Sequence, residues 1–221
     1  MGIKENLTKI KEQIGNIKVK IIAVTKYASE QQISEAYNLG ILDFGESYVQ
    51  DAIKKISKRC SDENLTNLIR WHFIGRLQKN KVKHVVGNFC LIHSVDSIEL
   101  AELISKTASK KELVQDILLQ TNISCEATKA GFKSDELKSS FEKLIKLPHI
   151  KILGLMTIAP KTENKKIIRS CFSTLKDLRE ELNQEYNTNI KELSMGMSDD
   201  YPIALEEGST ILRIGRAIFK N

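Results

Sequence analysis

The sequence has few of the residues that cross-link or rigidify small proteins. Among its 221 residues there are four cysteines and three prolines, and aromatic residues make up only 6%. The cysteines, Cys60, Cys90, Cys125 and Cys171, are widely spaced and form no C-x-x-C pair, which argues against a zinc site and a disulfide framework. We expect them to be reduced and mostly buried, in a chain whose 41% of hydrophobic residues suffices for an ordinary core.

Long hydrophobic runs are absent as well. No apolar stretch approaches the roughly 18 residues that a membrane-spanning helix needs. Residues 1–6 contain neither the apolar core of a signal peptide nor the Ser or Thr of a myristoylation motif. We therefore expect a cytoplasmic protein with no membrane partner.

The positive charge lacks the pattern of a nucleic-acid-binding surface. Thirty-four basic and 28 acidic residues leave a formal net charge of +6. The lysines, such as Lys54, Lys55 and Lys81, are scattered along predicted helices, and no aromatic residues alternate with them. We interpret them as solvated helix faces and expect no nucleic-acid partner. The basic balance also suits a phosphorylated ligand.

Short apolar runs alternate regularly with segments of helical period. The expected strands cover residues 18–26, 42–47, 70–75, 89–95, 114–122, 151–157, 190–195 and 209–214. This alternation, without a long linker, predicts one α/β domain over residues 1–221: a (β/α)8 TIM barrel with an extra N-terminal helix over 4–15. An open doubly wound sheet is the alternative. No G-x-G-x-x-G opens a helix, so a Rossmann dinucleotide site has no support.

Lys26 occupies the position where such folds place their chemistry. It ends the first β-branched run, and TIM barrels form their sites at the carboxyl ends of their strands. In the expected strand Ile22 and Val24 share its face. We expect the ammonium to be partly desolvated there, which lowers the pKa of a lysine and allows the amine to attack a carbonyl carbon.

The last two strands carry a second group of candidates. Barrels usually bind phosphate at these strand ends. Ser198 follows the seventh strand, where it either donates its hydroxyl to a phosphate or caps the expected helix 199–207. Arg213, between Ile211 and Gly215 on one face of the eighth strand, is either paired in a salt bridge at the rim or aimed at a ligand. Gly215 allows the backbone to approach a ligand closely.

Two further candidates have an ordinary structural interpretation. His72 stands between Trp71 and Phe73 on a strand whose successive residues face opposite ways, so it is either a hydrogen-bonded core histidine or a ligand contact. Met156, at the end of the sixth strand, either fills the core or packs against a planar ring.

Several motifs together resemble one family over residues 19–219. They are Ala23-Val24-Thr25-Lys26, Phe44-Gly45-Glu46, Trp71-His72-Phe73-Ile74-Gly75, Leu77-Gln78, Asn80-Lys81, Gly154-Leu155-Met156, Leu193-Ser194-Met195-Gly196-Met197-Ser198-Asp199-Asp200 and Arg213-Ile214-Gly215. With these motifs the chain resembles the pyridoxal phosphate homeostasis proteins, which are similar to the N-terminal barrel of alanine racemase.

The resemblance implies a cofactor, pyridoxal 5'-phosphate, held as a Schiff base on Lys26. It implies that Arg213 faces the pyridine nitrogen, and that Ser198, Gly215 and Arg216 bind the phosphate. An arginine opposite that nitrogen keeps it unprotonated, which weakens the ring as an electron sink. The predicted cofactor-binding residues are Lys26, Ser47, His72, Met156, Ser198, Arg213, Gly215 and Arg216, with no catalytic residue and no metal ligand.

Three positions depart from the family pattern. Ser47 stands where the family usually has asparagine, and its shorter side chain loses reach toward the cofactor. Arg216 replaces a small hydroxyl residue after Gly215, and Lys220 replaces a glycine near the end. These departures bear on affinity rather than on the choice of ligand.

The expected function is that of a monomeric, non-catalytic carrier in vitamin B6 homeostasis. Apo-enzymes that accept the cofactor are candidate partners. The alternative is a pyridoxal-phosphate-dependent, racemase-like enzyme, although racemases that resemble this barrel need an added domain that supplies a second acid or base. A third class, a cofactor-free Schiff-base aldolase on a phosphorylated sugar, would use the same lysine and phosphate site.

Overall fold

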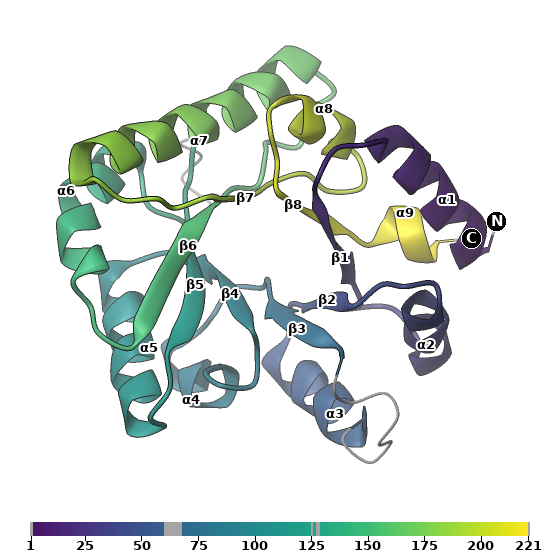
Figure 1. Cartoon of the computed structure of the whole chain (residues 1–221), viewed down its shortest axis with the longest axis horizontal. Coiled ribbons are helices and arrows are strands. Elements are labelled where there is room, and N and C mark those ends of the chain that lie inside the picture. Colours follow the sequence, from purple (N-terminus) through teal and green to yellow (C-terminus); the bar gives the residue numbers. More distant parts are fainter. Residues whose placement is uncertain (1, 60–67, 125, 127–128, 221) are drawn as a thin grey trace.

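The strands form a closed barrel of parallel strands that follow one another in chain order (Figure 1). The computed structural model describes residues 2–59, 68–124, 126 and 129–220. The strands are β1 (Lys20–Val24), β2 (Asp43–Glu46), β3 (Arg70–Phe73), β4 (Leu91–Val95), β5 (Gln115–Gln120), β6 (Ile150–Met156), β7 (Glu192–Ser194) and β8 (Ile211–Ile214). Because β1 pairs with both β2 and β8, the sheet has no free edge. The predicted barrel is confirmed, and the open sheet is excluded.

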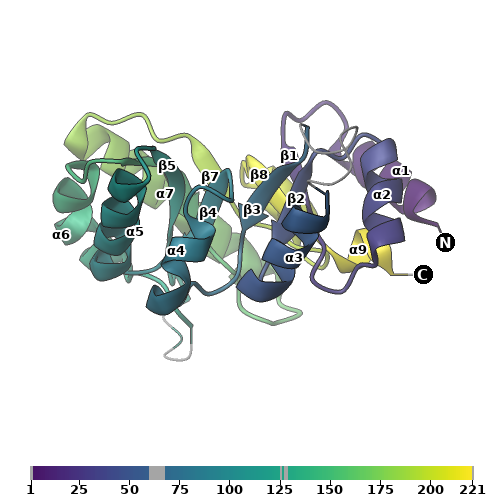
Figure 2. The same cartoon turned by 90° about the horizontal axis from the view of Figure 1, so that it is seen from below.

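Helices surround this barrel (Figures 1 and 2). They are α1 (Ile3–Ile14), α2 (Glu30–Asn38), α3 (Val49–Arg59), the 3-10 turn η1 (Lys79–Lys81), α4 (Val82–Val85), α5 (Ile98–Lys110), α6 (Ser134–Ile145), α7 (Lys165–Tyr186), α8 (Tyr201–Glu206) and α9 (Arg216–Phe219). The predicted additional helix, α1, lies beside α9, and Asn6 Nδ2 donates to the carbonyl of Ile218 at 3.0 Å. None of the described helices is long and apolar enough to cross a membrane.

Local sequence explains where the helices begin and which face they bury. Ser29 caps α2, since its hydroxyl accepts from the Gln32 N–H at 3.2 Å while Gln32 Oε1 accepts from the Ser29 N–H at 2.9 Å. The helix ends before Gly40, which has a φ of 90°. In α7 every residue of the apolar stripe is buried: Ile168, Cys171, Phe172, Leu175, Leu178 and Leu182.

The apolar side chains form two layers, as the alternation along each strand requires. The larger layer lies between the strands and the helices. The smaller one fills the inside of the barrel with Ile22, Leu91, Leu118, Met156 and Ile211. Because alternate residues of a strand share a face, Arg213 lies on the same inner face of β8 as Ile211. Lys26 comes two residues after the end of β1.

The cysteines agree only in part with the expectation. Cys171 is buried, but Cys90 is exposed, and both are free thiols. Cys60 and Cys125 lie outside the described residues. The one-domain organisation over residues 1–221 stays a prediction.

Candidate functional site

Lys26 lies in the turn that follows β1, at the mouth of the barrel. The preceding residue, Thr25, is buried, and its N–H donates to the carbonyl of Gly45 at 3.0 Å. Lys26 itself is exposed, with Nζ 5.0 Å from the centroid of the exposed Tyr27 ring. The expected desolvation is therefore not found. β1 ends at Val24, two residues before the lysine, so the side chain leaves the protected part of the sheet.

One cavity brings Lys26 and two of the predicted phosphate-binding residues together. It has a volume of about 380 Å³, and we call it the lysine cavity; its lining residues include Val24, Lys26, Gln32, Gly215 and Arg216. Gly215 approaches β1 closely, because a Cβ on it would lie 3.3 Å from both the Cβ and the carbonyl oxygen of Val24. A larger residue there would intrude between the two strand ends. Lys26 and the end of β8 thus lie at the same cavity.

Ser198 does not line the lysine cavity, but it contacts the first turn of α9, which contributes Arg216 to the cavity lining. Its hydroxyl accepts from the Ala217 N–H at 3.1 Å. The guanidinium of Arg216 pairs with the carboxylate of Asp199, and both side chains are exposed. The Arg216 side chain is therefore directed along the surface toward the segment between β7 and α8.

Ser198 does not cap α8, contrary to one of its two interpretations. That helix begins at Tyr201, with Asp200 as its N-cap. Asp200 Oδ1 accepts from the Met197 N–H at 2.6 Å, and burial raises the pKa of this carboxyl. The Ser198 hydroxyl is thus committed to the β8–α9 side of the site.

Arg213 is almost completely buried, with 5% of its surface exposed. Its Nη1 donates to Ser194 Oγ at 2.6 Å and its Nη2 to the carbonyl of Thr157 at 2.8 Å. Burial lowers the pKa of Arg213 to about 10, against the effect of nearby Asp200, so the guanidinium stays charged at neutral pH. In the part of the chain that the structure describes, no carboxylate forms an ion pair with it. The interpretation of Arg213 as one partner of a salt bridge at the barrel rim is therefore wrong.

His72 is a hydrogen-bonded core histidine. Its Nε2 lies 2.9 Å from Asp43 Oδ1, and its Nδ1 lies 3.1 Å from His93 Nε2. Trp71 and Phe73, on either side, face the outer hydrophobic layer. Although burial alone would raise it, hydrogen bonds from Arg70 and His72 hold the pKa of Asp43 well below its ordinary range. A direct contact of His72 with a ligand stays a prediction.

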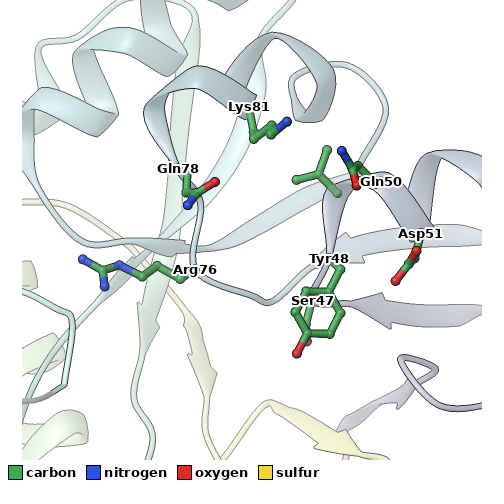
Figure 3. Close-up of a pocket in the computed structure, with 8 residues that line it drawn as sticks. Ser47, Tyr48, Gln50, Asp51, Arg76, Gln78 and Lys81 are labelled. Carbon is green, nitrogen blue, oxygen red and sulfur yellow. The ribbon is translucent and has the colours of Figure 1, made fainter.

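Five of the eight predicted cofactor-binding residues do not line the lysine cavity: Ser47, His72, Met156, Ser198 and Arg213. Met156 is buried inside the barrel with Ile22 and Ile211. Ser47 is half-buried and lines a second cavity of about 540 Å³. Figure 3 shows that cavity, with Arg76, Gln78 and Lys81 along one side and Ser47, Tyr48, Gln50 and Asp51 along the other. Their contacts with a cofactor also stay predictions.

A partly buried ion pair between Lys55 and Glu46, which the sequence did not reveal, contacts Thr25, the residue before Lys26. Lys55 Nζ donates to Glu46 Oε1 at 2.6 Å and to the carbonyl of Thr25 at 2.7 Å. The Thr25 hydroxyl also donates to Glu46 Oε1, at 2.6 Å. Lys55 is therefore not part of a solvated helix face as we expected. The only sequence signal was an acidic residue inside a predicted buried strand.

A second missed group connects β4 and β7. His93 Nδ1 lies 2.9 Å from Ser194 Oγ, and both residues are fully buried. Burial holds the pKa of His93 well below its ordinary value. A histidine and a serine in apolar strands gave no sign of this contact, because it crosses the inside of the barrel.

Comparison with known sequences identifies the family. The alanine racemase N-terminal domain family matches residues 2–221. A pyridoxal phosphate homeostasis protein of Aquifex aeolicus is 43% identical over 229 residues, which cover 99% of this chain and 98% of the relative. The chain belongs to the pyridoxal phosphate homeostasis protein family. Another member, from Synechocystis, is 40% identical over 201 residues, covering 91% of this chain and 90% of the relative.

Solved structures of other proteins have the same barrel. PipY of Synechococcus elongatus PCC7942, with PLP bound, is 34% identical to this chain with a TM-score of 0.89, and the match covers 98% of this chain and 99% of PipY. An alanine racemase of Clostridium difficile 630 is 14% identical with a TM-score of 0.82, covering 100% of this chain and 56% of the racemase. The latter likeness shows the fold alone.

Proposed function

We propose that this chain holds pyridoxal phosphate as a Schiff base on Lys26 and acts in vitamin B6 homeostasis without turnover. The observation that carries the proposal is the lysine cavity, which Lys26, Gly215 and Arg216 line together. Membership of the homeostasis family and the PLP-bound structure of PipY support it.

The residues at the end of β8 fit a phosphate group. The Ser198 oxygen accepts from Ala217, so its own hydrogen remains available to an anion. Gly215 keeps the approach to the β8–α9 backbone open. The Arg216–Asp199 pair is exposed and contributes little to stability, so a phosphate can compete with Asp199 for this guanidinium.

Arg213 fits the other end of the ligand. Pyridoxal phosphate supplies an aldehyde that condenses with an amine and a ring that can accept electrons. The Arg213 guanidinium only donates hydrogen bonds and stays charged at neutral pH. Facing the ring nitrogen, it leaves that nitrogen unprotonated. This choice of partner favours retention of the cofactor over carbanion chemistry.

The remaining predicted contacts contribute less directly in this proposal. Met156 fills the barrel at the carboxyl end of β6. His72 acts through His93 and Ser194 on Arg213. Ser47 stays a predicted contact, on the side of the second cavity. We also propose that the carrier is a monomer and delivers the cofactor to apo-enzymes, which size-exclusion chromatography and transfer assays with an apo-enzyme would test.

The absorption spectrum tests the proposal. The purified protein with added pyridoxal phosphate should develop the yellow colour of a protein Schiff base, and Lys26→Ala should not. Lys81→Ala, which removes a lysine of the second cavity, is the matched control and should keep the colour. A wild-type protein that gains no colour would contradict binding. Turnover of free amino acids that Lys26→Ala abolishes would contradict the non-catalytic role.

A further inference from the structure

A chain of hydrogen-bonded side chains crosses the inside of the barrel. Arg213 Nη1 contacts Ser194 Oγ at 2.6 Å, and Ser194 Oγ contacts His93 Nδ1 at 2.9 Å. His93 Nε2 contacts His72 Nδ1 at 3.1 Å, and His72 Nε2 contacts Asp43 Oδ1 at 2.9 Å. We call these residues the interior chain: Asp43, His72, His93, Ser194 and Arg213. Each of them is buried, with 7% or less of its side chain or residue surface exposed.

The two ends of the interior chain can act in only one way. The Asp43 carboxylate is ionised at neutral pH and can only accept, whereas the Arg213 guanidinium can only donate. Burial lowers the pKa of His72 and of His93, so each imidazole is neutral and carries one N–H. These fixed ends leave a single consistent arrangement of hydrogens.

The arrangement follows link by link. His72 must carry its hydrogen on Nε2 to donate to Asp43, so its Nδ1 accepts. His93 must then donate from Nε2, and its own Nδ1 accepts the hydroxyl hydrogen of Ser194. The Ser194 oxygen is left to accept from Arg213. Every member is thereby satisfied, and every hydrogen bond points toward Asp43.

We propose that the interior chain is unidirectional, that it fixes His72 and His93 as Nε2–H tautomers, and that it makes Ser194 and His93 positioning residues for Arg213. Hydrogen bonds in such a chain polarise one another, so the Asp43 carboxylate makes Ser194 Oγ a better acceptor for the guanidinium. This accounts for a buried cation that has no paired carboxylate in the described part of the chain. The consequence for the ligand nitrogen rests on the proposed function; the tautomers do not.

Other charged groups around the two histidines oppose their protonation. Lys20 on β1 and Arg70 on β3 lower the pKa of His72, and Lys20 and Arg213 lower that of His93. Cys90 Sγ lies 3.5 Å from His72 Nε2. Although the residue as a whole is exposed, this contact is partly buried, and desolvation of the sulfur raises the pKa of the thiol to about 11, so it brings no charge. Among the described residues, Asp43 is the one group in direct contact that favours protonation of His72.

Nitrogen-15 NMR of the histidine-labelled, unliganded full chain tests the proposal. At pH 7, His72 and His93 should each show a protonated Nε2 and an unprotonated Nδ1, with the exposed His84 and His149 as internal references. In Asp43→Asn the new amide can also donate, so the chain loses its fixed direction and the Nδ1–H tautomer should appear on both rings together. Arg70→Met, the matched control, removes the other partner of Asp43 but keeps the carboxylate, and both tautomers should persist.

Three results would overturn the proposal. They are an Nδ1–H or an imidazolium on either ring of the wild-type protein, a response to Asp43→Asn confined to His72, and unchanged pyridoxal phosphate affinity in Ser194→Ala. Ser194→Ala should weaken the binding of pyridoxal phosphate about fivefold, the effect of one lost hydrogen bond. This variant tests the proposal even if Asp43→Asn does not fold. A wild-type protein that shows both Nε2–H tautomers but binds no pyridoxal phosphate would refute the proposed function and leave the interior chain intact.

Discussion

The charged side chains at the mouth of the barrel are exposed, whereas those in its interior are buried. At the mouth, Lys26 and Arg216 are exposed, and the side chains that they contact, Tyr27 and Asp199, are exposed too. Inside, Arg213 and Asp43 are buried, and each of their polar partners is held at hydrogen-bonding distance. Arg213, the arginine proposed to face the cofactor ring, is thus held by buried hydrogen bonds, while Lys26 and Arg216, the residues proposed to attach the cofactor, are exposed. This division suits a protein that must both load and release its ligand.

Substitutions should separate the two regions, since buried changes affect folding and exposed ones affect only binding. The largest effect is expected for Lys55→Met. It leaves Glu46, whose side chain is fully buried, without its cation. Glu46 Oε2 already has no hydrogen-bond partner among the described residues. We expect a loss of about 3–5 kcal/mol in the free energy of unfolding, measured by urea denaturation.

The double variant Lys55→Met, Glu46→Gln is the control for that prediction. With no buried carboxylate left uncompensated, it should recover a substantial part of the lost stability. Equal stabilities of the single and double variants would show that Lys55 contributes through packing rather than through its charge. The expected difference between buried and exposed charges would then not hold for Lys55.

The stability of the folded protein should fall on mild acidification. Burial lowers the pKa of His72 and His93 in the folded state, so the unfolded chain takes up protons first as the pH falls below about 6.5. Their contribution is fully present above that pH and is lost toward the lower folded pKa. Between pH 7 and 5.5 we therefore expect the free energy of unfolding, measured by urea denaturation at each pH, to decrease.

The slope of unfolding free energy against pH identifies the histidines responsible. His93→Phe should reduce this slope, because one of the two buried imidazoles is gone. Replacing the exposed His84 and His149 with glutamine should leave it unchanged. A pH-independent stability in the wild-type protein would mean that the interior chain accepts protons in the folded state.

Much of the fold could be predicted from the sequence because it depends on local periodicity. The stripe of α7 and the cap at Ser29 are properties of neighbouring residues, and the alternation of strands and helices implied the barrel. Barrel closure then brings β1 beside β8, so the proximity of Lys26 and Gly215 followed from the fold alone. The expected desolvation of Lys26 was wrong because the strand was predicted to extend to residue 26, whereas β1 ends at Val24 and leaves Lys26 in an exposed turn.

The interior chain could not be predicted, for a physical reason. Contacts such as those of His93 with Ser194 cross the barrel and depend on the relative stagger of β4 and β7, which no local pattern encodes. The same holds for Lys55, whose partners lie on β2 and in the turn after β1. Ser47 was assigned to the site from its motif, but its loop faces a separate cavity.

The smallest effect is expected at the mouth. Asp199→Asn removes the surface partner of Arg216, which frees the guanidinium for phosphate. Because exposed ion pairs are weak, pyridoxal phosphate affinity should rise only about twofold, with stability unchanged within about 0.5 kcal/mol. Fluorescence titration and urea denaturation would measure the two quantities. A loss of affinity would show that Asp199 orients the site instead of competing with the ligand.

The most direct test is to locate the cofactor on the chain. Borohydride reduction of the protein loaded with pyridoxal phosphate, followed by proteolysis and mass spectrometry, should place the phosphopyridoxyl group on Lys26. Lys26→Ala should carry no such group and should unfold within about 0.5 kcal/mol of the wild type, because the side chain is exposed. Label on another lysine, or label distributed over many lysines, would contradict the account.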